Sequence, residues 1–99
     1  MYTPTEQEIK EAKKKHVRVL LLEFPEIGMA CMLAKPSRQV VALAFTKAQT
    51  DPLGMSQVIR DNCWIAGDED LRTNDDYLVS MNTKIDKLIG ITTAELKEL

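Results

Sequence analysis

The sequence has few of the residues from which catalytic and metal sites are built. Its 99 residues include one histidine, His16, and two cysteines, Cys31 and Cys63. The cysteines are too far apart for a CxxC pair or a set of zinc ligands, so we expect two small buried thiols and no metal site. Nucleophilic catalysis needs a nucleophile, a base within reach and a group that orients the base, which one histidine after a run of lysines does not supply. We therefore expect that the protein is not an enzyme.

Glycine is scarce and dispersed. The four glycines stand at positions 28, 54, 67 and 90. Loops that bind phosphate groups need several glycines close together, because their backbone amides must approach the phosphate oxygens. The sequence therefore predicts no nucleotide site, and we expect no cofactor.

Acidic residues gather in one stretch, residues 68–76, without the pattern of a calcium loop. Such a loop needs alternating oxygen ligands, a glycine at its sharp turn and a late bidentate glutamate. Here Leu71 and Arg72 interrupt the spacing, and neither the glycine nor the late glutamate follows. We expect a solvated loop in which Asn74 or Asp75 caps the next helix.

Long apolar runs and a strong net charge are also absent. The chain has no stretch of roughly 18 apolar residues that would span a membrane, and its first residues lack the basic start and apolar stretch of a signal peptide. We therefore expect a cytoplasmic protein whose thiols stay reduced. A net charge of −2 and a pI near 5.4 give no field strong enough to collect DNA or RNA.

The composition that is present is that of a folded domain. Hydrophobic residues make up 44% of the chain and charged residues 28%, both ordinary shares for a globular protein. At this length we expect one compact domain over residues 1–99. Methionines at positions 29, 32, 55 and 81 suit either irregular core packing or an adaptable binding surface.

The first part of the chain predicts a helix followed by a β-hairpin. Thr5 and Glu8 have the spacing of a capping box, which starts a helix over residues 6–15. Residues 17–24 and 29–34 are short apolar runs joined by a proline- and glycine-containing turn. Both faces of these strands are largely apolar, so we expect the hairpin to be covered on two sides or extended by a partner strand.

The remainder of the chain predicts helices. They are expected over residues 38–49, from residue 52 to between residues 62 and 65, over residues 76–89 and over residues 92–99. Ser37 and Asp51 are capping residues for the first two, Gly90 ends the third, and Thr92 with Glu95 repeats the capping-box spacing. The expected fold class is α+β, with an N-terminal helix, a β-hairpin, then three to four packed helices.

Two surfaces are candidates for binding. The hairpin offers apolar side chains to a protein partner or to a second copy of the chain, and the candidates are Leu20, Leu22, Met29 and Met32. The first helix and its end offer basic side chains to nucleic acid, and the candidates are Lys10, Lys13, Lys14 and Arg18. Glutamates in the same helix offset much of this charge and no aromatic residues alternate with it, so a nucleic-acid-binding regulator is the alternative function.

Several segments together resemble a known family. They are the lysine-rich first helix leading into residues 17–22, the Lys35-Pro36 step, the interruption at residues 50–53, and residues 62–68 followed by an acidic loop and a leucine-rich helix. This pattern resembles small proteins encoded among phage and prophage structural genes and described as tail assembly chaperones.

The resemblance implies a function without catalysis. Members of that family bind other phage proteins, such as the tape-measure protein, in the cytoplasm of the bacterial host while the tail forms. We therefore expect a protein-binding factor in the assembly of a phage or prophage tail. A self-assembling structural component is a further alternative, because an apolar hairpin suits a homo-oligomer interface equally well.

Overall fold

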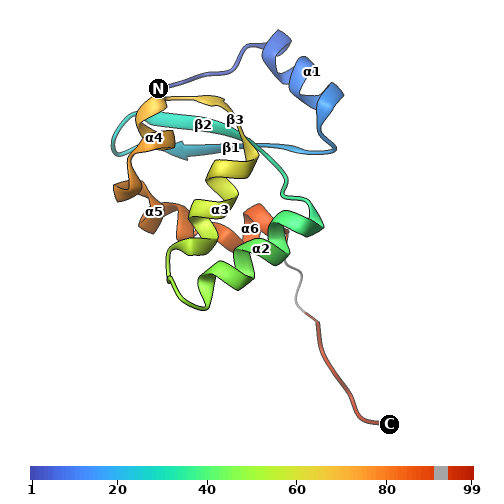
Figure 1. Ribbon diagram of the computed structural model, residues 1–99. Helices are drawn as coiled ribbons and strands as arrows, with labels where there is room; N and C mark the ends of the chain where they lie inside the picture. The colour runs from blue at the N-terminus through green and yellow to red at the C-terminus, as the bar shows by residue number, and fades with distance from the viewer. Residues whose placement is uncertain (91–93) are drawn as a thin grey trace.

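The described chain contains one helix before a β-hairpin and a third short strand among the helices that follow (Figure 1). The computed structural model describes residues 1–90 and 94–99. The elements are α1 (Glu6–Lys15), β1 (Val19–Phe24), β2 (Met29–Ala34), α2 (Arg38–Ala48), α3 (Gly54–Cys63), β3 (Trp64–Gly67), α4 (Glu69–Thr73), the 3-10 turn η1 (Asp75–Tyr77), α5 (Leu78–Asn82) and α6 (Ile85–Ile89). This order confirms the predicted α+β class, with an N-terminal helix, a hairpin and packed helices after it.

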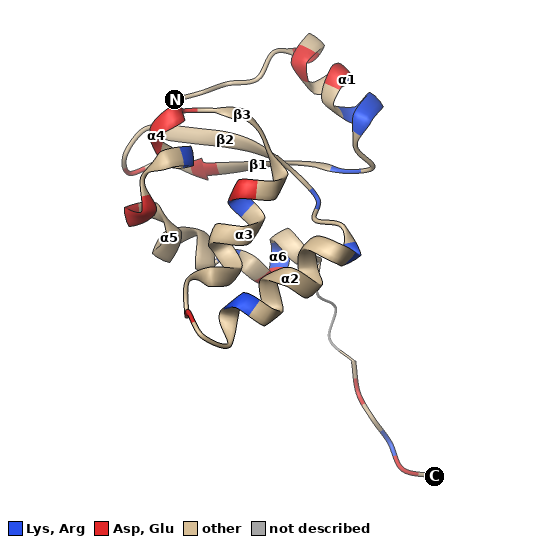
Figure 2. Cartoon of the chain, in the orientation of Figure 1, with Lys and Arg blue, Asp and Glu red and all other residues tan. Residues whose placement is uncertain are grey.

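Helix α1 begins and ends where the sequence predicts. The Thr5 hydroxyl accepts a hydrogen bond from the Glu8 N–H at 3.1 Å, and the Glu8 carboxylate accepts one from the Thr5 N–H at 3.2 Å. This capping box satisfies amides that have no partner within the helix. Acidic residues lie at the start of α1 and basic residues at its end (Figure 2), an order that the helix dipole favours.

Strands β1 and β2 form the predicted hairpin. They pair antiparallel, from Val19 opposite Ala34 to Phe24 opposite Met29. In the turn between them Gly28 has a φ of 64°, a left-handed conformation that glycine adopts without strain. The strand order is β1-β2-β3, so that β2 lies in the centre and β1 at one margin of the sheet.

Strand β3 is not predicted from the sequence, which indicates helix as far as residues 62–65. Helix α3 instead ends at Cys63, and the chain passes directly into the strand. The register places Cys31 opposite Gly67, Met32 opposite Ala66 and, after an irregularity, Leu33 opposite Trp64. Trp64 and Ile65 favour a strand, but it is the pairing with β2 that decides the conformation, because both strands then satisfy their peptide groups.

One face of the sheet carries the hydrophobic core. Alternate residues of β1 and β2 point to this face, among them Leu22, Phe24, Cys31 and Leu33. The helices contribute the buried side chains of Ala44, Ile59, Leu71, Leu78, Met81 and Leu88. Full burial of a large apolar side chain contributes roughly 1.5–3 kcal/mol, so this layer holds α2, α3, α5 and α6 against the strands.

Helix α1 lies on the opposite face of the sheet (Figure 1). Ala12 is its buried residue, at 5% exposure. The space between α1 and the strands is lined on the sheet side by Met32, Trp64 and Ala66, which places the helix over β2 and β3. Helix α1 therefore covers the second side of the hairpin only in part, since Leu21 of β1 stays exposed there. The additional strand, β3, comes from the same chain.

The N-terminal segment ties α1 to the end of the sheet. The Tyr2 N–H donates to the Asp68 carboxylate at 3.2 Å, and the Tyr2 hydroxyl donates to the Glu8 carboxylate at 2.8 Å. Burial, followed by the hydrogen bond to Glu8, raises the pKa of Tyr2 to about 12. Asp68 also accepts the Ala30 N–H at 2.8 Å, so one carboxylate oxygen joins three segments.

The segment from residue 69 to residue 89 has more breaks than the sequence predicts. Helix α4 lies within the expected solvated loop, and the expected helix over residues 76–89 is divided into η1, α5 and α6. At the second break the Thr83 hydroxyl donates to the Ser80 carbonyl at 2.7 Å. Such bonds from short polar side chains to the backbone compete with the helical pattern. Gly90 ends α6 with a φ of 82°, as predicted.

The predicted last helix is wrong over residues 94–99, which have no regular secondary structure. Its expected start at Thr92 lies outside the described residues.

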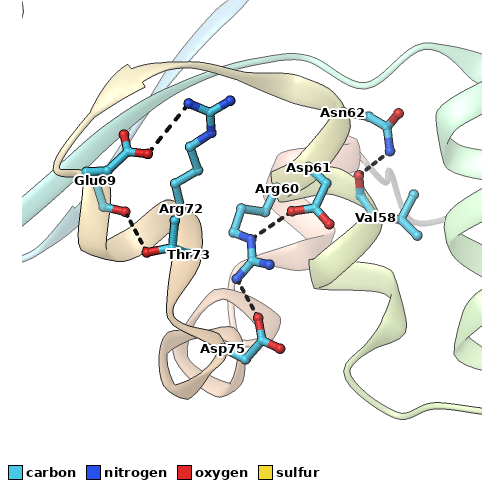
Figure 3. Close-up of polar contacts among 8 residues, drawn as sticks. All are labelled: Val58, Arg60, Asp61, Asn62, Glu69, Arg72, Thr73 and Asp75. Carbon is cyan, nitrogen blue, oxygen red and sulfur yellow. Dashed lines mark hydrogen bonds and ion pairs between the residues drawn. The ribbon is translucent and has the colours of Figure 1, made fainter.

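A buried arginine fastens α3 to η1 (Figure 3). Arg60 is 4% exposed; its Nε donates to Asp61 Oδ1 at 3.0 Å, and its Nη1 lies 3.0 Å from Asp75 Oδ1 as an ion pair. The second contact is not aligned as a hydrogen bond, so its contribution is electrostatic. The sequence does not reveal this contact, because Asp75 reaches Arg60 only through the fold.

Gly67→Ala tests the close approach of β3 to β2. A Cβ at position 67 would lie 2.5 Å from the Cα of Cys31, and Gly67 has a φ of 150°. We expect the free energy of unfolding in urea to fall by at least about 2 kcal/mol. Gly28→Ala is the matched control, because its φ is also positive but its Cβ would meet nothing within 4 Å. A similar loss in both variants would contradict the proposed contact.

Candidate functional site

The outer side of β1 carries peptide groups that bond to no other strand. The Lys35 N–H donates to the Arg18 carbonyl at 3.0 Å, which makes this a hydrogen-bonded pair of the antiparallel ladder. Such pairs recur at every second residue. The N–H and C=O groups of Val19, Leu21 and Glu23 therefore point away from β2. Among the described residues no hydrogen bond engages them, and together we call them the β1 edge.

An open edge of this kind favours the addition of another strand. Proteins commonly protect edges with charged side chains, prolines, bulges or very short strands. Strand β1 has six residues, no proline and one charged side chain, Glu23. Its central residue, Leu21, is 47% exposed.

Two adjoining hollows follow β1, and together we call them the β1 groove. The first encloses about 270 Å³ and is lined by Leu20, Leu21, Leu22, Glu23, Lys84, Lys87 and Leu88. The second encloses about 440 Å³ and is lined by residues 22–27 with Tyr77, Ser80, Thr83 and Lys84. Both hollows are lined by Leu22, Glu23 and Lys84, so they adjoin along the strand.

The groove has an apolar floor, and its charged lining consists of Glu23, Glu26, Lys84 and Lys87. Leu20, Leu22 and Leu88 pack against the core and form the floor. Lys84 and Lys87 are exposed beside it, and together we call them the lysine rim. Among residues 1–90 and 94–99, Arg60 and Arg72 are the basic residues that form salt bridges. Lys84 and Lys87 therefore form no ion pair with any of these described residues.

The structure separates the four apolar residues predicted as protein contacts. Leu20, Leu22 and Met29 are half-buried and face the core side of the sheet, and the first two line the β1 groove. Met32 is 2% exposed beneath α1, which removes it as a surface contact. The exposed apolar residue of β1 is Leu21, which sequence reasoning missed because residues 19–22 are all apolar.

Three of the four basic residues predicted as nucleic-acid contacts lie on one exposed side of α1. Lys10, Lys13 and Lys14 are exposed at helical spacing, and Arg18 is exposed beyond the helix end. Glu6 and Glu11 of α1 are also exposed, which weakens a basic patch. Nucleic-acid binding through this surface stays a prediction.

The acidic stretch has structural roles in the described part of the chain. Asp68 accepts backbone N–H groups at the end of the sheet, and Asn74 accepts the Asp76 N–H at 3.0 Å, which confirms it as a capping residue. Within residues 1–90 and 94–99 no group of three His, Cys, Asp or Glu side chains is placed to hold a metal ion. No helix among these residues has the length and apolar character to cross a membrane.

Both thiols are free and buried, as predicted. Burial, followed by the charge of Asp68, raises the pKa of Cys31 to about 12. Burial also raises the pKa of Cys63. Because the thiolate is the nucleophile, these environments suppress cysteine reactivity at neutral pH.

Comparisons with known proteins identify a protein with a similar fold and indicate no function. No protein-family model and no curated protein matches the chain. A solved structure of uncharacterised protein rbstp2171 from Bacillus stearothermophilus is similar, with a TM-score of 0.67 and 13% sequence identity. The match covers 91% of this chain and 99% of that one. At this identity the similarity shows a shared fold alone.

Paired proline substitutions test which peptide groups of β1 point outward. Proline has no N–H and is tolerated in a sheet where that N–H faces solvent. We expect Leu21→Pro to fold and to lower the free energy of unfolding modestly, because its N–H is unpaired. Leu22→Pro removes a ladder hydrogen bond and a core side chain, and we expect it to cost at least about 3 kcal/mol more in urea unfolding. Equal losses would contradict the assigned register.

Proposed function

We propose that this chain is a non-catalytic protein-binding domain that adds an extended segment of its partner to the β1 edge. The observation that carries the proposal is the set of outward peptide groups at Val19, Leu21 and Glu23 beside an apolar groove. In strand addition, main-chain hydrogen bonds align the segment, and pockets for alternate side chains select it.

The β1 groove supplies binding free energy that main-chain hydrogen bonds alone do not provide. A net hydrogen bond contributes only about 0.5–1.5 kcal/mol, and association costs at least about 4 kcal/mol in lost freedom. Binding therefore needs apolar burial in addition, at roughly 25 cal/mol per Å². Leu20 and Leu22, which are half-buried, and Leu21, which is 47% exposed, offer that burial directly at the edge.

Four side chains of types that can serve in catalysis have structural environments instead. Cys31 and Cys63 are buried thiols with raised pKa values, and the side chains of Asp68 and Asn74 hold backbone groups. The resemblance to tail assembly chaperones suggests the class of partner within this proposal: a phage tail protein such as the tape measure, bound in the cytoplasm of the bacterial host.

A peptide-display selection tests strand addition whatever the natural partner is. Random peptides of about 12 residues are selected on the immobilised wild-type protein and then measured against two variants. We expect the selected peptides to bind wild type and, more weakly, Leu21→Ala, since the alanine variant keeps the N–H of residue 21. We expect Leu21→Pro to lose binding at least about 10-fold, because it lacks that donor.

Two results would contradict the proposal. One is a selection that enriches no binding peptide. The other is a set of peptides that bind Leu21→Pro as tightly as wild type, which would place the binding surface elsewhere. Urea unfolding of each variant provides the control that the proline variant is folded.

A further inference from the structure

We propose that the segment added to β1 carries an acidic side chain over the apolar groove, and that Lys84 and Lys87 recognise it. The inference rests on the proposed function and gives the chemistry of the partner. The lysine rim lies beside β1 rather than on the far surface of the helices.

Strand geometry decides which side chains of the partner meet the rim. In a strand paired with β1, alternate side chains point to the same face as Leu20 and Leu22. That face contains the groove, with an apolar floor and two ammonium groups beside it. The other face of the added strand lies beside Leu21, which is apolar and exposed. A matching segment thus places apolar residues next to Leu21 and a carboxylate on the groove face.

The charge of the rim changes along the strand. Lys87 borders only the hollow that contains Leu20, and Lys84 borders both hollows. Glu26 lies at the far end, beside the hairpin turn. The acidic side chain of the partner is therefore placed over Leu20 and Leu22, away from that turn.

A second copy of the chain fits the edge less well. Pairing Leu21 with its counterpart in another copy joins outward peptide groups to outward peptide groups and sets Leu20 beside Leu22 of the second copy. This arrangement brings the lysine rims of both copies to the same face of the seam. Glu23 borders both hollows, but in each copy Lys84 and Lys87 outnumber it beside the hollow that contains Leu20. The charges favour an acidic partner strand over self-association.

Three synthetic peptides test the charge preference. Each has seven residues that alternate between the two strand faces, with valines on one face and threonines at both ends of the other. The two remaining positions are glutamates in the first peptide, lysines in the second and glutamines in the third. Each peptide carries a fluorescent label, and binding is measured by anisotropy at about 50 mM salt, where surface charges are weakly screened.

We expect the glutamate peptide to bind wild type at least about 10-fold more tightly than the lysine peptide, with the glutamine peptide between them. The double variant Lys84→Glu/Lys87→Glu is expected to reverse this order. Lys10→Glu/Lys13→Glu makes the same change in net charge on α1 and is expected to keep the order. Leu21→Pro is expected to lose all three peptides.

The possible failures are distinguishable. Equal binding of the three peptides, lost in Leu21→Pro, would overturn the acidic preference and leave strand addition standing. Binding that survives Leu21→Pro, or no binding up to about 1 mM peptide, would overturn the strand-addition function as well. A concentration-dependent dimer that Leu21→Pro dissolves, and that excludes the peptides, would replace the acidic partner by a second copy.

Discussion

The pairing of β2 on both of its sides is the interaction on which the rest of the structure depends. Its peptide groups bond to β1 along one side, and to β3 and the Asp68 carboxylate along the other. Its side chains divide between two layers, with Cys31 and Leu33 in the helical core and Met32 beneath α1. A central strand whose peptide groups are hydrogen-bonded on both sides is costly to disrupt. Its displacement would leave buried N–H and C=O groups without partners.

Because β2 is central, β1 and β3 form the two edges of the sheet, and these edges differ in length and in covering. Strand β3 has four residues, and α1 lies beside it across a space lined by Trp64, Ile65 and Ala66. Strand β1 has six residues and faces a groove with an apolar floor. Short strands and covering elements protect an edge, whereas a longer and mostly apolar strand invites pairing. The proposed binding site follows from this difference between the margins.

Local signals in the sequence predict local structure well. The capping box of Thr5 and Glu8, the turn before Met29 and the glycine after α6 each depend on residues within a few positions of one another. Strand β3 depends instead on pairing with β2, more than 30 positions earlier in the register. The strand preference of Trp64 and Ile65 covers too few residues to separate this run from the helix before it. The helix break near Thr83 likewise depends on a hydrogen bond from a side chain to the backbone, which the spacing of apolar residues does not predict.

The candidate site is predictable from the sequence only in outline. An apolar hairpin points to a protein-binding surface, but a strand with four consecutive apolar residues does not reveal which alternate set faces the core. The sequence suggests Leu20 and Leu22 as surface contacts, while the fold directs Leu21 outward. The lysine rim comes from α6 and the residue before it, and only the tertiary structure brings it beside β1.

Amide hydrogen exchange along β1 tests the central claim most directly. The open edge predicts an alternation in the partner-free protein: the amides of Leu20 and Leu22 exchange slowly because they bond to β2, and those of Leu21 and Glu23 exchange at least about 100-fold faster. Uniform protection of all four amides would contradict the open edge, because it would show that the outer side of β1 is already paired.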